Sequence, residues 1–153
     1  MRVGQAGGDG KRFAVAGDGV IDPNDDCPGT PQGVKVNERG NSGMYFRVTP
    51  NPAPNNPWPN GYEAQIDQHD PKNFTGCIYN AAWPEDVKAP ITKDNAWFDY
   101  RIRAEGNRIR TWINGVPMVD AQLEQFDEGH LAVQGHHQGN VIMFKDIRVL
   151  ELD

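Results

Sequence analysis

The sequence predicts an all-β fold, an antiparallel sandwich of the jelly-roll type, from three observations. Seventeen glycines and twelve prolines among 153 residues interrupt the chain too often for long helices. Apolar and polar residues alternate in several short segments, as in strands with one buried face. These segments follow one another closely, which favours antiparallel pairing over the long crossovers of a parallel sheet.

Strand signals begin near residue 41 and continue to the C-terminus. In the first of them, Met44, Phe46 and Val48 alternate with Tyr45 and Arg47. The glycine within residues 105–107 predicts a hairpin turn, and the proline-rich stretch 50–60 predicts a loop. The later signals cover residues 62–67, 76–79, 98–104, 109–113, 116–120, 131–136 and 141–152, giving about eight strands and no helix.

The N-terminal segment, residues 1–40, lacks such signals. Glycine, aspartate and proline dominate there, and Phe13-Ala14-Val15 is a short apolar cluster among them. This composition predicts turns and loops rather than packed strands. We therefore expect an irregular, acidic, turn-rich segment over residues 1–40 and a β-sandwich over residues 41–153.

Composition narrows the range of partners. The net charge is -6 without any basic run, which disfavours nucleic acid and anionic membrane surfaces. No apolar run is long enough to span a bilayer, and the N-terminus lacks the apolar core of a signal peptide. We expect no membrane insertion, and a neutral ligand fits better than a charged one. Cys27 and Cys77 allow one disulfide or two free thiols.

Polar side chains recur at every second position on three predicted strands. Residues two apart share a face of a strand, so each row can line one surface. We expect the three rows to meet on the concave face of one sheet. The rows are Tyr45 and Arg47; Glu63, Gln65 and Asp67; and Gln134 and His136.

Six short motifs occur in the order and spacing of one protein family. They are residues 41–47 (NSGMYFR), 62–66 (YEAQI), 75–79 (TGCIY), 97–102 (WFDYRI), 113–116 (INGV) and 144–149 (FKDIRV). Residues 41–152 thereby resemble the 3-keto-disaccharide hydrolase domain, a bacterial concanavalin-like sandwich also described as a 3-keto-glucoside lyase or hydratase. The resemblance implies a carbohydrate ligand and a periplasmic or secreted location. It also implies that the segment 1–40 replaces the leading strands of the family.

The chemistry that the resemblance implies begins at carbon 2 of a 3-keto sugar. The ketone acidifies the hydrogen on this carbon, so that a base can remove it, the anomeric substituent can leave, and water can add to the enone. Such a path needs a base, an acid and a group that stabilises the enolate. The catalytic candidates are His136, Glu63 and Arg47.

Each catalytic candidate has an alternative interpretation. His136 is the leading base because imidazole accepts a proton near neutral pH, but it is equally a surface loop residue. Glu63 suits a base, an acid or a ligand of a divalent metal beside His136, or is an exposed strand carboxylate. Arg47 suits enolate or hydroxyl recognition, or forms a cross-strand ion pair with Glu63.

The expected substrate-binding residues are side chains that can hold sugar hydroxyls or stack on a sugar ring. Trp112 is either a sugar platform or a core residue of the opposite face, and Trp58 is a second candidate for stacking. Trp83 and Trp97 are expected to pack. The binding candidates are Tyr45, Gln65, Asp67, Trp112 and Gln134.

Two departures from the family favour an alternative function, a non-catalytic carbohydrate-binding module of the same fold. Gly135 stands where the family usually has aspartate, and His137 stands where glycine is more usual. The leading strands are also not evident in this sequence. A sheet edge left unpaired in this way would favour a homo-oligomer.

A second resemblance concerns residues 17–31, which resemble a thrombospondin type 3 calcium repeat. Asp18, Asp22 and Asp25 match the repeat, and calcium prefers such hard oxygen ligands. Ala14 and Ala16 stand where two more aspartates would be expected. An acidic linker without bound Ca²⁺ is the alternative interpretation.

Overall fold

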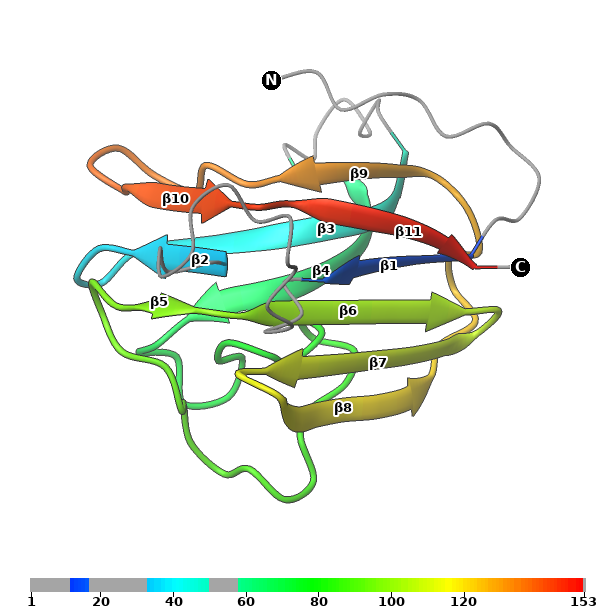
Figure 1. Cartoon of the computed structure of the whole chain (residues 1–153), viewed down its shortest axis with the longest axis horizontal. Coiled ribbons are helices and arrows are strands. Elements are labelled where there is room, and N and C mark those ends of the chain that lie inside the picture. The colour runs from blue at the N-terminus through cyan, green and yellow to red at the C-terminus, as the bar shows by residue number, and fades with distance from the viewer. Residues whose placement is uncertain (1–11, 17–32, 50–57, 153) are drawn as a thin grey trace, which may run out of the picture.

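The computed structural model describes residues 12–16, 33–49 and 58–152, and all regular elements in these ranges are strands. The prediction of an all-β fold is therefore confirmed (Figure 1). The strands are β1 (Arg12–Ala16), β2 (Gly33–Val36), β3 (Asn41–Thr49), β4 (Asn60–Asp67), β5 (Trp97–Phe98), β6 (Tyr100–Glu105), β7 (Arg108–Ile113), β8 (Val116–Gln122), β9 (His130–Val133), β10 (Ile142–Lys145) and β11 (Arg148–Leu152).

These strands form three antiparallel sheets that make a sandwich. The first has the order β11-β1-β6-β7-β8 and the second has the order β10-β2-β5. Because Asp99 alone separates β5 from β6, and only Asp146 and Ile147 separate β10 from β11, the second sheet continues the first. The third sheet, β4-β3-β9, forms the other layer (Figure 1).

The core lies between the layers and explains the local alternation. On β3 and β4, Phe46 and Ile66 are fully buried against apolar residues of the other layer. Ile102, Ile109 and Ile113 supply that side of the core from β6 and β7. Each fully buried side chain of this size contributes about 1.5–3 kcal/mol to folding. The opposite face of β3 and β4 is thereby left to polar side chains.

The N-terminal segment contributes more regular structure than the sequence indicated. β1 pairs with both β11 and β6, and β2 pairs with both β10 and β5. These two strands are so short that their alternation does not stand out among the surrounding glycines and prolines. The expected calcium ligands Asp18, Asp22 and Asp25 lie outside the described residues, as does Cys27.

Residues 76–79 were predicted as a strand, but the structure places only one residue there in bridges. Ile78 makes isolated bridges with Ala64 and Ala82, within a loop that folds back on β4. In the same loop Cys77 is a buried, free thiol. Burial, with the nearby carboxylates of Asp70 and Glu63, raises the pKa of this thiol to about 12. We therefore expect it to be unreactive in the folded protein.

A β-bulge interrupts β3 near its end. The register with β4 shifts between Phe46 and Thr49, and Arg47 has a φ of 55°, in the left-handed region. Gly129 (φ 141°) packs against the bulge. Only glycine fits there, because a Cβ at that position would lie 2.5 Å from the backbone carbon of Arg47. The bulge changes the alternation after Phe46, and every residue from Ser42 to Val48 is buried.

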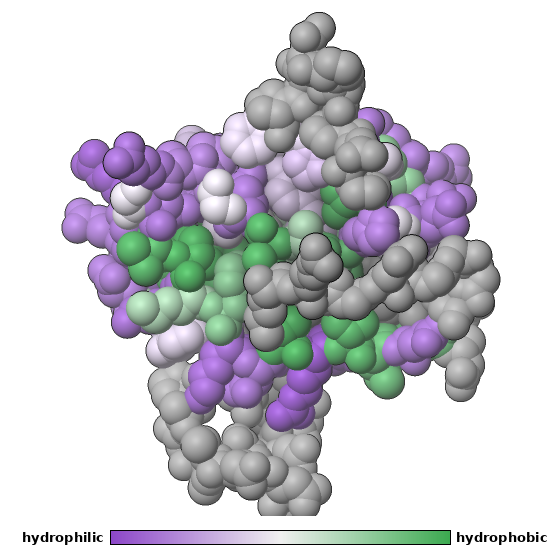
Figure 2. All heavy atoms as spheres, turned by 90° about the horizontal axis from the view of Figure 1, so that it is seen from above, coloured by the Kyte–Doolittle hydropathy of each residue, from purple (hydrophilic) through white to green (hydrophobic). Residues whose placement is uncertain are grey.

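Apolar side chains are exposed along the side of the molecule that carries β9, β10 and β11. Figure 2 views this side and shows a band of apolar residues between polar ones. Each of the three strands is at one end of its sheet in the described part of the chain. Association into a homo-oligomer through this edge stays a prediction, which light scattering can test. The exposed residues are Val133, Val141, Met143, Ile147, Val149 and Leu150.

No helix long and apolar enough to cross a membrane occurs in the parts of the chain that the structure describes.

Candidate functional site

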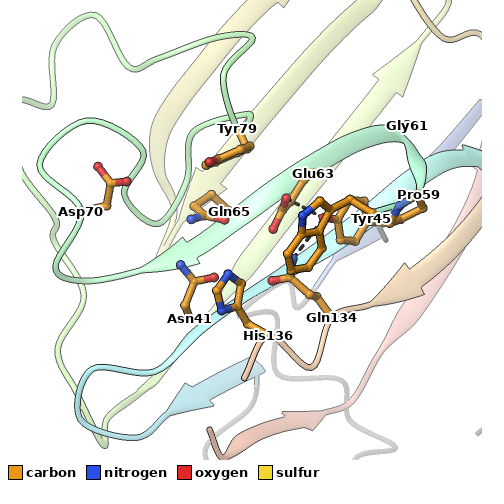
Figure 3. A pocket seen from close by; sticks show the side chains of 11 residues that line it. Asn41, Tyr45, Pro59, Gly61, Glu63, Gln65, Asp70, Tyr79, Gln134 and His136 are labelled. Atoms are coloured by element: carbon orange, nitrogen blue, oxygen red, sulfur yellow. Dashed lines mark hydrogen bonds between the residues drawn. The ribbon is translucent and has the colours of Figure 1, made fainter. Parts of the chain in front are cut away.

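An open pocket of about 340 Å³ lies on the outer face of the β4-β3-β9 sheet. Its floor comes from β3 and β4, and its walls come from the segments that flank them (Figure 3). The lining residues are Asn41, Tyr45, Trp58, Pro59, Gly61, Glu63, Gln65, Asp70, Tyr79, Gln134 and His136.

Strand register places the polar floor. Tyr45 pairs with Glu63, and Gly43 pairs with Gln65 two positions along β3. Because residues two apart share a face, these side chains point away from the core. The segment after β9 joins them, since the N–H of Gln134 donates to the carbonyl of Gly43 at 3.0 Å.

Glu63 is the centre of a buried hydrogen-bond network. Its Oε2 accepts from the hydroxyl of Tyr45 at 2.7 Å, and that hydroxyl accepts from Nε2 of Gln134 at 3.0 Å. In the amide orientation that pairs donors with acceptors, Gln65 donates to Oε1 of Glu63 at 3.1 Å and to the carbonyl of Ser42 at 3.2 Å. The carboxylate is therefore held in one position from both sides.

The network sets the protonation behaviour of two groups. Burial raises the pKa of the Glu63 carboxyl, although the hydrogen bonds from Tyr45 and Gln134 act against this. Burial, together with the neighbouring Glu63, raises the pKa of Tyr45 well above its usual value. Tyr45 is thus a neutral donor, while Glu63 can take up and release a proton closer to neutrality than an exposed carboxylate can.

Gly43 makes room for the Glu63 side chain. A Cβ at position 43 would lie 2.4 Å from Oε1 and 2.5 Å from Cγ of Glu63, closer than atoms can approach. We predict that Gly43→Ala turns Glu63 out of its bond with Tyr45, so that the pKa of the carboxyl moves back toward its ordinary value. Titration of the Glu63 carboxyl ¹³C signal by NMR would measure this shift.

Gly135→Ala is the matched control, because nothing lies within 4 Å of a Cβ built there. It should leave the titration of Glu63 unchanged. If Gly43→Ala also leaves it unchanged, the steric role given to Gly43 is wrong.

The loop after β4 forms the wall that carries Asp70 and Tyr79. Oδ1 of Asp70 accepts from the N–H groups of Lys72 (2.7 Å) and Asn73 (2.8 Å). Burial acts to raise the pKa of the Asp70 carboxyl, but these backbone donors outweigh it and hold that pKa below its usual range. The N–H of Tyr79 donates to the carbonyl of Glu63 at 2.9 Å, which fixes this wall beside the floor.

His136 and Trp58 stand together at the rim. Their rings are stacked, with centroids 5.4 Å apart and an interplanar angle of 20°. Nδ1 of His136 also lies 3.1 Å from Nδ1 of the neighbouring His137. Both rim side chains are exposed. The rim therefore offers an aromatic surface and an imidazole to the solvent side of the pocket.

The structure brings together five residues of the three predicted rows and one of the two tryptophans that the sequence offered for stacking. The row residues are Tyr45, Glu63, Gln65, Gln134 and His136, and the tryptophan is Trp58. The row residues meet on one face of the β4-β3-β9 sheet. Three other predicted residues do not line the pocket.

Arg47 is one of them, and its expected place beside Tyr45 is wrong. The bulge in β3 turns its side chain away, and Arg47 is only 3% exposed. Its guanidinium donates to the carbonyls of Phe126 (2.9 Å) and Gly106 (2.6 Å). The alternative of an ion pair with Glu63 is not formed either, and Arg47 instead ties two loops to β3.

Asp67 and Trp112 also lie outside the pocket lining. Oδ2 of Asp67 accepts from Nδ2 of Asn41 at 2.7 Å, so Asp67 positions a lining residue instead of lining the site itself. Trp112 lies on the outer face of β7, with the guanidinium carbons of Arg101 and Arg110 at 5.0 and 5.7 Å from its ring centre. It is therefore neither a sugar platform in this pocket nor a core residue.

Sequence reasoning missed several lining residues. Asn41 has the same parity as Tyr45 on β3, so the alternation contained a signal for it. Pro59 and Gly61 adjoin the predicted strand 62–67. Asp70 and Tyr79 belong to an irregular loop, where no periodicity indicates which side chains face a cavity.

A divalent metal beside Glu63 and His136 was one of the sequence-based alternatives. In the described ranges, no three or more His, Cys, Asp or Glu side chains gather as ligands of one metal ion. The pocket lining is instead dominated by amides, aromatic rings and two carboxylates. The donor set does not fit a divalent metal, and we assign no chemical step to one.

Comparison with known families gives a match over most of the chain. Residues 32–150 match the family described as the 3-keto-alpha-glucoside-1,2-lyase-like domain. The match includes β2, which precedes the first of the sequence motifs. No curated protein matches the chain.

Solved structures share the fold. A candidate glycosyl hydrolase of Parabacteroides distasonis aligns with a TM-score of 0.68 and 20% identity, over 93% of this chain and 70% of its own. A second candidate glycosyl hydrolase of that organism aligns at 0.65 and 19%, over 94% and 78%. The carbohydrate-binding module CBM66 of Bacillus subtilis aligns at 0.57 and 18%, over 91% and 74%. These similarities support the β-sandwich fold that the sequence predicted.

Proposed function

The chain belongs to the 3-keto-alpha-glucoside-1,2-lyase-like family, and from that premise we propose that it cleaves 3-keto-glycosides by elimination followed by hydration. The observation that carries the proposal is a buried carboxylate, Glu63, held at the floor of an open, polar pocket with its pKa raised by burial. A carboxylate of this kind is suited to accept a proton from carbon.

Glu63 is the proposed base. It removes the hydrogen from carbon 2 of the sugar, and the electron pair of the C–H bond moves into the enolate of the C3 ketone. Tyr45 and Gln65 hold the carboxylate at 2.7 and 3.1 Å, so little reorganisation is needed for the transfer. After elimination, the oxygen of a water molecule adds to carbon 1 of the enone, and Glu63 delivers a proton to carbon 2.

His136 is the proposed acid for the departing glycosidic oxygen. The sugar ring enters the pocket while the leaving group remains toward solvent, where His136 and Trp58 stand. When the C1–O bond breaks, the oxygen takes a proton from the imidazolium form of His136, and the water that later adds to carbon 1 gives a proton back to this imidazole. This assignment reverses the sequence-based preference for His136 as the base, because Glu63 is the buried group of the two.

The developing enolate oxygen requires a hydrogen-bond donor. Arg47, which the sequence suggested for this role, donates to loop carbonyls instead. Tyr79 carries a hydroxyl on the wall beside Glu63, with its backbone fixed to the carbonyl of that residue. We assign to the Tyr79 hydroxyl the hydrogen bond that stabilises the oxygen of the C3 ketone as it becomes an enolate. A carbohydrate ligand of this class fits the expected periplasmic or secreted location.

The proposal is tested by comparing two leaving groups. Methyl 3-keto-glucoside needs protonation of its departing oxygen, whereas 4-nitrophenyl 3-keto-glucoside releases a stable anion. We predict that the protein releases both, and that His136→Ala slows methanol release by about 10²-fold but nitrophenol release by less than about tenfold. Initial rates of both products would measure this.

The control variant is His69→Ala, because His69 is an exposed residue outside the pocket lining that contacts Asp94. Its rates should equal those of the original protein. Equal slowing of both substrates by His136→Ala would contradict its role as the acid. Release of neither product by the original protein would overturn the proposed function.

The alternative function is carbohydrate binding without chemistry. Two observations favour it: the exposed Trp58 ring at the rim, suited to stacking on a sugar, and the fold shared with a carbohydrate-binding module. The resemblance to the family adds a third point, because Gly135 stands where that family usually has aspartate. A binding module would hold methyl 3-keto-glucoside without releasing methanol.

A further inference from the structure

Gln134 lines the pocket, and Figure 3 shows its amide oxygen on the side of His136. The hydroxyl of Tyr45 has one proton, which it donates to Glu63 at 2.7 Å, so the group of Gln134 that faces this hydroxyl must be its NH₂. The orientation of the amide is thereby fixed. Its Oε1 is buried and has no hydrogen-bond partner among the residues that the structure describes. An acceptor in this state favours a ligand that brings a donor.

Asn41 is oriented in the same sense. Its Nδ2 donates to Oδ2 of Asp67 at 2.7 Å. Asp67 is itself held by the N–H groups of His69 (2.7 Å) and Asp70 (3.0 Å), which donate to its other oxygen. Figure 3 shows the amide oxygen of Asn41 on the side of His136 and its nitrogen on the far side. The amide oxygen, an acceptor, therefore faces the pocket.

Asp70 adds a charged acceptor to the same cavity. Two backbone N–H groups fix its Oδ1, and the carboxylate lines the pocket. An ionised carboxylate can only accept hydrogen bonds. Three polar side chains from three different segments thus offer oxygen acceptors to one ligand.

We propose that the pocket selects its ligand by hydroxyl donors, with Gln134 and Asn41 as specificity-determining acceptors. A sugar hydroxyl can donate to them, whereas a ketone oxygen cannot. The ketone of the substrate is therefore turned away from these two amides, toward the wall that carries Tyr79. The orientation of the ketone rests on the proposed function, but the selection of hydroxyl donors does not.

The test uses methyl glucoside, which has no C3 ketone to react, and its analogues. At each of carbons 2, 4 and 6, the hydroxyl is replaced either by hydrogen or by fluorine, and Kd is measured by calorimetry. Fluorine can accept weakly but cannot donate. We expect at least one position at which the deoxy and fluoro analogues both bind about tenfold more weakly than methyl glucoside, to equal extents.

Variants connect that position to a residue. Gln134→Met removes the acceptor. For the hydroxyl that Gln134 binds, this variant should therefore bind methyl glucoside as weakly as it binds the deoxy and fluoro analogues changed at that carbon. Gln122→Met is the matched control on the exposed side of β8 and should keep the discrimination. Asn41→Ala provides a second test, and thermal unfolding verifies that each variant is folded.

Three results would overturn the inference. The first is that the fluoro analogues at carbons 2, 4 and 6 all bind as tightly as methyl glucoside. The second is discrimination that survives in both Gln134→Met and Asn41→Ala. The third is a lack of binding by methyl glucoside itself. In all three cases release of methanol from methyl 3-keto-glucoside would still support the proposed function, so the two failures can be told apart.

Discussion

Replacement of Glu63 by glutamine is expected to slow turnover of methyl 3-keto-glucoside by about 10²- to 10⁴-fold, the range for loss of a general base. Glutamine has nearly the same shape, and its amide can still accept the hydrogen bond that Tyr45 now donates to Glu63. The variant should therefore stay folded and keep its affinity for methyl glucoside within a few-fold. Steady-state rates and calorimetry would measure these two effects separately.

The pH profile gives the same residue an independent signature. A base works in its ionised form, so activity is lost as pH falls through the pKa of Glu63 in the free protein. Because burial raises that pKa above its ordinary value of 4.5, the acid limb of kcat/KM should lie above the range of an exposed carboxylate. Glu38→Gln, at an exposed turn residue, is the control and should keep both rate and profile. An unchanged rate in Glu63→Gln would remove this residue as the base.

Replacement of Arg47 by methionine is expected to lower the free energy of unfolding by about 2–4 kcal/mol. The guanidinium is almost fully buried, and its loss leaves the carbonyls of Phe126 and Gly106 without their donors. Turnover by the folded fraction should change by less than about threefold, because Arg47 does not line the pocket. Denaturant unfolding and rates at low temperature would separate the two effects.

Arg101→Met is the matched control for Arg47→Met. Arg101 is exposed and lies over the outer face of Trp112, so its loss should cost at most about 1 kcal/mol. The role given to Arg47 would be contradicted if Arg47→Met kept its stability and lost turnover. That pattern would place the guanidinium at the substrate, as the sequence alone suggested.

The alternation of side chains predicted the floor of the pocket because β3 and β4 are regular where it matters. Tyr45 lies directly opposite Glu63, so the polar faces of the two strands coincide and bring Gln65 to the same surface. Gln134 could also be placed, since it follows a strand that pairs with β3. Regular pairing preserves a period of two, and that period can be seen in a sequence.

The prediction failed where the backbone departs from that period. The bulge at Arg47 adds a residue to β3 and turns the guanidinium toward other loops, and the residues around it give no sign of this. Asp70 and Tyr79 face the pocket because their loop folds back on β4 through hydrogen bonds to its backbone. Such contacts depend on the tertiary fold, which local sequence patterns do not specify.

The short strands β1 and β2 were missed in the sequence for another reason. Each is stabilised by strands from distant parts of the chain. β1 pairs with β6 and β11, and β2 pairs with β5 and β10. Strand propensity is weak in such short segments, and pairing decides their structure. No local pattern within residues 1–40 therefore indicates that this segment contributes to both parts of the larger layer.

Proton abstraction from carbon 2 is the central claim, and deuterium exchange tests it most directly. Methyl 3-keto-glucoside is incubated with the protein in deuterated water and followed by NMR. We predict that the signal of the carbon 2 hydrogen disappears as methanol is released, and that Glu63→Gln abolishes both changes while Glu38→Gln abolishes neither. A substrate that keeps this hydrogen and shows only line broadening would contradict the claim and identify the protein as a binding module.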